Sequence, residues 1–172
     1  VRSSAAQMCI RDRYGGNHYI NNSGRNDIVL SKVAVDKENV YFYVQTANPI
    51  TSSTDPNWML LLIDADNNYS TGWYGYDYLI NQSVVDNTST QIKWYDNTKN
   101  EWVKKNVLAY KAKGNCLELA VSRKDLGLLE DAFVFDFKWA DNPKELKDPI
   151  SLCTDGDTAP NRRFNCRCIW KK

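Results

Sequence analysis

Residues 64–78, DADNNYSTGWYGYDY, carry oxygen-bearing side chains at a spacing that suits a metal ion. Asp64, Asp66 and Asn68 stand at i, i+2 and i+4, as the first ligands of a calcium-binding EF-hand loop do. Calcium accepts about six to eight oxygens in irregular geometry. These three side chains, backbone carbonyls and Asp77 could therefore form an oxygen cage for a structural calcium ion.

An EF-hand is excluded, and a second interpretation of the loop stays open. The sixth loop position, a glycine in EF-hands, is Tyr69, and the twelfth, a glutamate, is Gly75. The apolar run WMLLLI before the loop predicts a strand where an EF-hand has a helix. The second interpretation is a metal-free turn, capped by Asp, Asn, Ser and Thr side chains, in which Gly72 supplies a positive φ.

Aromatic side chains in and near this loop could bind sugars, because pyranose rings stack their C–H faces on flat aromatic surfaces. The chain has 6 Trp and 10 Tyr. The candidates for such a platform are Trp73, Tyr74, Tyr76, Trp94 and Trp102. For Trp94 and Trp102, which flank the turn DNTKN, the alternative is a cross-strand aromatic pair that only stabilises the hairpin.

Nothing in the sequence assembles a catalytic centre. Glycoside hydrolysis needs two carboxyl groups about 5–10 Å apart across one cleft. Several aspartates are available, but no spacing pairs them: Asp64, Asp66, Asp77, Asp136, Asp155 and Asp157. The single histidine, His18, is not accompanied by a serine hydrolase motif. We therefore expect a domain that is not an enzyme.

The composition is that of one folded, nearly neutral domain. The chain has 172 residues, of which 42% are hydrophobic, and this is enough for a core of its own. Its 22 basic and 21 acidic residues give a formal net charge of +1, so no strong attraction to nucleic acid or to an anionic membrane is predicted. No apolar run approaches the roughly 18–20 residues of a transmembrane helix.

The elements that must position these side chains are β-strands. Apolar residues alternate with a period of two along most of the chain, and turn residues separate the runs. Strands are predicted over residues 28–36, 39–46, 58–64, 76–82, 91–96, 101–110, 115–122, 132–141 and 163–170. Short helical turns are predicted within 122–129 and 142–148. About nine strands at short spacing predict an all-β fold, an antiparallel β-sandwich.

The chain divides into three segments. Residues 1–13, VRSSAAQMCIRDR, fit no strand or helix pattern and resemble a translated sequencing adapter, so we expect them to be a non-native scar. Residues 14–25 are interpreted as an N-terminal extension, and residues 26–172 as one sandwich domain. We also expect that part of the natural protein precedes this segment.

Four cysteines lie in the predicted domain: Cys116, Cys153, Cys166 and Cys168. None forms a CxxC pair, so the spacing does not indicate zinc. One interpretation is that they are buried thiols, which pack as small hydrophobic groups. A disulfide from Cys153 to Cys166 or Cys168 stays open if the protein is exported.

Four segments carry a family resemblance: NDIVLSKVAVDKENVYFYVQT, WMLLLIDADNNYSTGWYGYDYLIN, LELAVSRKDLGL and FDFKWADN. They resemble the family 9 carbohydrate-binding modules and the related DOMON-like β-sandwiches. The ending GDTAPNRRFNCRCIW is similar to the end of sandwich domains attached to bacterial glycoside hydrolases. The resemblance implies a jelly-roll-like sandwich, often with a structural calcium, that binds sugar or supports a catalytic domain.

Together these observations predict a non-catalytic carbohydrate-binding accessory domain, the C-terminal part of a secreted or periplasmic glycoside hydrolase. The expected partners are a polysaccharide or oligosaccharide and a catalytic domain N-terminal in the same chain. One alternative is a purely structural sandwich that packs on the catalytic domain without binding sugar. Another is a haem-binding DOMON-like module, for which Met59 is the axial ligand available inside the fold.

Overall fold

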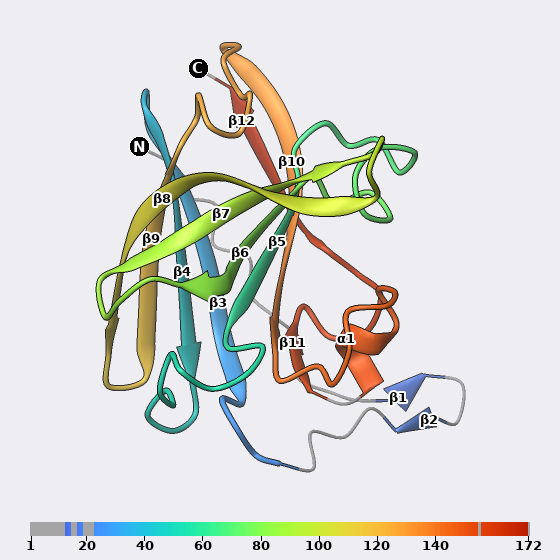
Figure 1. Cartoon of the computed structure of the whole chain (residues 1–172). Helices are drawn as coiled ribbons and strands as arrows, with labels where there is room; N and C mark the ends of the chain where they lie inside the picture. The colour runs from blue at the N-terminus through green and yellow to red at the C-terminus, as the bar shows by residue number, and fades with distance from the viewer. Residues whose placement is uncertain (1–12, 15–16, 19–22, 155, 172) are drawn as a thin grey trace.

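Antiparallel strands make up nearly all of the regular structure in the computed structural model, which describes residues 13–14, 17–18, 23–154 and 156–171 (Figure 1). A small pair, β1 (Arg13–Tyr14) and β2 (Asn17–His18), precedes the main sheet. The main sheet contains β3 (Ile28–Val35), β4 (Asn39–Thr46), β5 (Leu60–Asp64), β6 (Tyr78–Val84), β7 (Ser89–Asp96), β8 (Glu101–Lys113), β9 (Cys116–Ser122), β10 (Ala132–Asp141), β11 (Asp157–Ala159) and β12 (Cys166–Lys171). One short helix, α1 (Ser151–Thr154), lies in the described residues. The predicted all-β fold is confirmed.

The main sheet is one continuous hydrogen-bonded path that folds over on itself. Its order is β11-β10-β5-β6-β7-β8-β9-β4-β3, and β12 pairs with β10 beside β11. The long strand β8 belongs to both layers, because residues 101–109 pair with β7 and residues 110–113 pair with β9. The path nearly closes: the N–H of Ile28 on β3 donates to the carboxylate of Asp157 on β11 over 2.5 Å.

Apolar side chains fill two separate regions. The larger core lies between the layers and contains Phe135, Phe137 and Trp139 of β10, as the alternating pattern of that strand predicts. The smaller core lies on the opposite face of β5, β6 and β10, where the 65–77 loop and α1 cover Leu60, Leu62 and neighbouring side chains. Strand β5 therefore has apolar contacts on both faces, which explains its unbroken apolar sequence.

The nine predicted strands are all present, with ends shifted by a few residues, and β11 is an additional short strand. The helical turn predicted within 122–129 is a single turn, in which the N–H of Leu126 donates to Ser122 O over 3.2 Å. The turn predicted within 142–148 is wrong: the helix is α1, a few residues later. There Asp148 caps the first turn by accepting the N–H groups of Ile150 and Ser151.

A buried aspartate ties the start of the sandwich to its end. Asp141 is fully buried and accepts hydrogen bonds from the side chains of Arg25 and Asn26 and from the N–H of Met59, at 2.8–3.1 Å. Arg25, the last residue of the predicted N-terminal extension, is thus ion-paired to the core. The predicted scar over residues 1–13 lies, apart from Arg13, outside the described residues.

No helix in the described part of the chain combines the length and apolar character needed to cross a membrane. The four cysteines outside the predicted scar are free thiols, three of them buried. Cys116 is half-buried, and its Sγ lies 3.0 Å from the hydroxyl of Tyr43.

Candidate functional site

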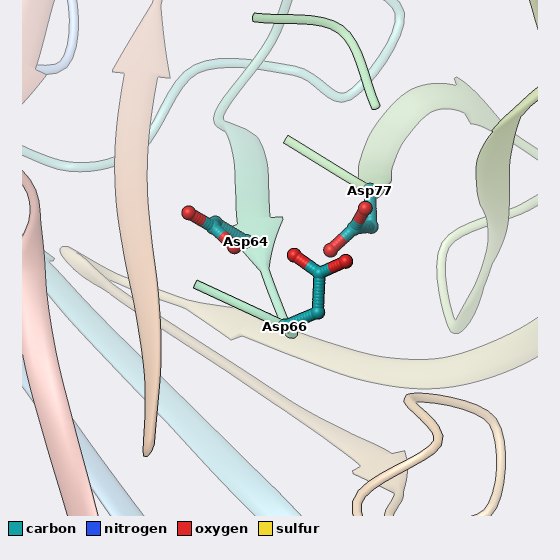
Figure 2. Close-up of side chains that lie close together, drawn as sticks. All are labelled: Asp64, Asp66 and Asp77. Carbon is teal, nitrogen blue, oxygen red and sulfur yellow. The ribbon is translucent and has the colours of Figure 1, made fainter. Parts of the chain in front are cut away.

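The side chains of three aspartates, at the ends of β5 and β6 and in the loop between them, lie close together (Figure 2). Asp64 is the last residue of β5, and Asp77 directly precedes β6. Ile63 and Tyr78 are paired across these antiparallel strands. Asp64, which follows Ile63, and Asp77, which precedes Tyr78, therefore lie at the same end of the strand pair. Asp66 follows in the connecting loop, and one carboxylate oxygen from each of the three aspartates lies within 4.8 Å of the others.

Hydrogen bonds fix the conformation of the 65–77 loop. Asp66 accepts the N–H of Asn68 over 2.8 Å and the hydroxyl of Thr71 over 2.9 Å. Asp77 accepts the N–H of Ala65 over 2.8 Å. At Gly72, where φ is 66°, a Cβ would collide with the backbone carbonyl of Tyr76, so glycine is required. The capped turn of the second interpretation is therefore present, and it brings the carboxylates together.

Asp64 is the member of this cluster with unmet polar capacity. Its side chain is buried, and its Oδ1 has no hydrogen-bond partner among the described residues. Burial and the nearby charge of Asp77 raise the pKa of Asp64 to about 6. Burial also raises the pKa of Asp77. The site thus concentrates negative charge at a cost that a bound cation would offset.

The donor set fits calcium. The clustered ligands are oxygens alone, which calcium prefers, whereas zinc takes nitrogen and sulfur. The fit is supported by the orphaned buried oxygen of Asp64. Asn68, the fourth predicted ligand, uses its Oδ1 to accept the N–H of Ser70 over 3.0 Å, so its role as a ligand stays a prediction.

The predicted sugar-binding aromatics divide into buried and exposed groups. Trp73 and Tyr76 are buried in the smaller core, with little ring face left for a ligand. Tyr74 is 48% exposed, and its ring meets that of Trp73 edge to face at 5.5 Å. Trp102 is half-buried and lies 6.3 Å from Trp73. An aromatic cluster therefore extends from the core to the surface at Tyr74.

The expectation that Trp94 and Trp102 face each other is wrong. In the β7–β8 hairpin Tyr95 is opposite Trp102, and Trp94 is opposite Val103. Tyr95 and Trp102 form the cross-strand aromatic pair, with ring centroids 5.0 Å apart. Successive residues on a strand point to opposite faces, so Trp94 is directed away from the Tyr74 cluster, and it is 40% exposed.

The segment of residues 160–165, which contacts Tyr76 beside this site, was not predicted from the sequence as part of it. Lys138 on β10 is buried, and its ammonium donates to the carbonyls of Pro160, Arg162 and Phe164 at 2.6–3.0 Å. Burial lowers the pKa of Lys138 to about 8. A residue further on, Asn165 accepts the hydroxyl of Tyr76 over 2.6 Å. A lysine inside an apolar strand was the available signal.

Comparison of the chain with protein-family models, with curated proteins and with solved structures found no match. The resemblance to family 9 carbohydrate-binding modules and DOMON-like domains stays a prediction. Met59, the candidate haem ligand, is fully buried in the larger core.

Proposed function

We propose that this chain is a non-catalytic carbohydrate-binding β-sandwich whose ligand loop is held in place by Ca²⁺. The observation that carries the proposal is that the 65–77 loop bears both the carboxylate cluster and the exposed ring of Tyr74. A metal that orders this loop would order the aromatic platform with it. The module would serve a secreted or periplasmic glycoside hydrolase as an accessory domain, as the family resemblance implies.

The proposed role of the aspartates is to hold the ion. Asp64, Asp66 and Asp77 supply carboxylate oxygens, and the ion supplies the positive charge that their crowding lacks. Hydrogen bonds from Ala65 and Thr71 orient two of these carboxylates independently of a metal. The loop is thus organised in advance, and this lowers the entropy lost on binding.

The proposed role of the aromatics is to supply the apolar part of sugar binding. Sugar hydroxyls exchange water for protein hydrogen bonds with little net gain, so affinity must come from burying a ring face. Tyr74 provides that face, and Trp73 supports its ring from the side. Stacking of one or two rings predicts dissociation constants on the order of micromolar to millimolar.

A second candidate function, packing against a catalytic domain, is favoured by one surface. Val134 and Ile169 are cross-strand partners on β10 and β12, and they are 37% and 66% exposed. Apolar side chains exposed next to each other on a sheet would be covered by such a contact. This candidate does not require a sugar site, so sugar binding discriminates between the two functions.

Affinity electrophoresis in gels that contain soluble plant, algal or host polysaccharides tests the proposal. Wild type should be retarded by at least one polysaccharide, and EDTA should reduce the retardation. Tyr74→Ala should abolish it. Tyr69→Ala is the matched control, because Tyr69 lies in the same loop with 78% exposure but belongs to no ring contact among the described residues. Equal mobility in every gel would instead favour the packing function.

A further inference from the structure

A groove of about 570 Å³ lies on the outer face of the β3-β4-β9-β8 layer, far along the sheet from the 65–77 loop. Its floor contains Tyr41 and Tyr43 of β4, which alternate with inward-pointing core residues. Tyr41 has alanines as both cross-strand neighbours, Ala34 on β3 and Ala120 on β9. Because these neighbours are small, space remains on either side of the tyrosine ring.

Both tyrosines are tethered at their hydroxyl groups, and in opposite directions. The hydroxyl of Tyr41 donates to Asp36 Oδ2 over 2.8 Å, which draws the ring along the strand toward the β3–β4 turn. The hydroxyl of Tyr43 donates to Gln45 Oε1 over 3.3 Å and lies 3.0 Å from Cys116 Sγ, toward the other end of the strand. The rings therefore lie along the sheet and diverge, with the groove between them.

Charged side chains flank the tyrosines in one row across the layer. Lys32, Tyr43, Glu118 and Lys111 are successive cross-strand partners on β3, β4, β9 and β8. With a strand spacing of about 4.8 Å, the two lysines stand about 14 Å apart. Lys32 lies over the ring of Tyr43, 5.6 Å from its centroid, and neither lysine forms an ion pair with a carboxylate in the described part of the chain.

We infer that this face is a second glycan site, which takes an acidic polysaccharide. The tethered ring of Tyr41, 40% exposed, would stack on a pyranose ring. The two lysines, unpaired and separated by the width of the groove, would each meet a sugar carboxylate. Glu118 lies between them, so the favourable positions for acid groups are the two ends of the row.

This inference stands apart from the function proposed for the 65–77 loop. It needs neither calcium nor Tyr74, and it adds the class of ligand and a second point of attachment.

Affinity electrophoresis with polygalacturonate and with a neutral glucan tests the inference, with the fold of each variant checked by its melting curve. Wild type should be retarded by polygalacturonate, and Tyr41→Ala should weaken binding about tenfold. Tyr41→Phe, which keeps the ring and loses only the tether, should retain most of it. Tyr74→Ala should leave this retardation unchanged, so the two sites fail independently.

Charge variants of Lys32, Lys111 and Glu118 give the sign of the electrostatic effect. The double variant Lys32→Ala with Lys111→Ala should weaken binding and reduce its dependence on salt. Glu118→Gln should strengthen binding, because it removes a negative charge from the row. Absence of retardation by polygalacturonate, equal retardation by the neutral glucan, or no response to the charge variants would each overturn the inference. Binding of DNA in preference to polygalacturonate would do so as well.

Discussion

Asp64 and Asp136 are cross-strand partners on β5 and β10, and among the described residues only Asp136 has a counterion. Asp136 receives two hydrogen bonds of 2.8 Å from the guanidinium group of Arg167 on β12. Asp64 has no such partner, and its Oδ1 is buried without a hydrogen bond among the described residues. Arg167 thus neutralises the charge of Asp136 but not that of Asp64, which lies beside the 65–77 loop.

Removal of calcium should lower the melting temperature of wild type. A ligand that binds only the folded state stabilises it by about 2.7 kcal/mol at a hundredfold excess over its dissociation constant. Melting curves in EDTA and in excess calcium should therefore differ, and Asp64→Ala should remove the difference. Glu38→Gln, which alters an exposed acid in the turn between β3 and β4, is the control and should retain it. Coincident wild-type curves in the two buffers would contradict a structural calcium site.

Without metal, the stability of the protein should fall between mildly acidic and neutral pH. The pKa of Asp64 is raised to about 6 in the folded state, against about 3.9 when unfolded. Its stabilising contribution is present below the unfolded pKa and is lost as the pH rises through about 6. Up to about 3 kcal/mol is at stake.

Urea denaturation in EDTA, at several values between about pH 4 and about pH 7.5, measures this dependence. Asp64→Asn cannot ionise and should flatten that part of the profile, becoming more stable than wild type at neutral pH. Parallel profiles of wild type and Asp64→Asn would show that the carboxyl group of Asp64 titrates normally.

Lys138→Met should destabilise the protein by about 2–4 kcal/mol, because the carbonyls of Pro160 and Phe164 would lose this donor and that of Arg162 would keep only the thiol of Cys153. Lys93→Met is a matched control: Lys93 donates to Gln82 alone, and its loss should cost less than about 1 kcal/mol. Chemical denaturation gives both values. In Lys138→Met, faster hydrogen exchange in residues 160–165 should accompany the loss, since the ammonium is what holds that segment. Equal stability of the two variants would refute this role.

Trp102→Ala and Trp94→Ala should separate a packing residue from a surface residue. Trp102 packs against Tyr95 and Trp73, so its truncation should cost about 2–3 kcal/mol. Trp94 is 40% exposed and contacts no other ring in the described residues, so its truncation should cost about 1 kcal/mol or less. A larger loss of stability in Trp94→Ala than in Trp102→Ala would instead identify Trp94 as the packing residue of the hairpin.

The fold was predictable because its signals are local. Alternation in residues 132–141 and the unbroken apolar run before Asp64 each specify how many faces of a strand are covered. Strand β11 has three residues, too few for a period to show. The assignment of the helical turn to 142–148 failed because the cap at Asp148 determines where the turn begins.

The candidate site was predictable only in part, for a related reason. Asp66 and Asp77 lie in one loop and Asp64 directly precedes it, so their sequence spacing already implies proximity. Whether Trp94 and Trp102 face each other depends on the register of the hairpin, and a shift of one residue changes which side chains are opposite. The Tyr41 groove and the arginine partner of Asp136 arise from strands distant in sequence, and no spacing could reveal them.

The hydrogen bond from Ile28 to Asp157 and the ion pair of Arg25 with Asp141 also affect how the chain folds. Both join the beginning of the sandwich to its last quarter, so the loop that closes them spans more than a hundred residues. Contacts between residues so far apart in sequence slow folding, because the chain loses conformational entropy before these contacts can stabilise it. On the ribosome, the contact of Ile28 with Asp157 cannot form until β11 has emerged from the exit tunnel, although β4 can pair with β9 before then.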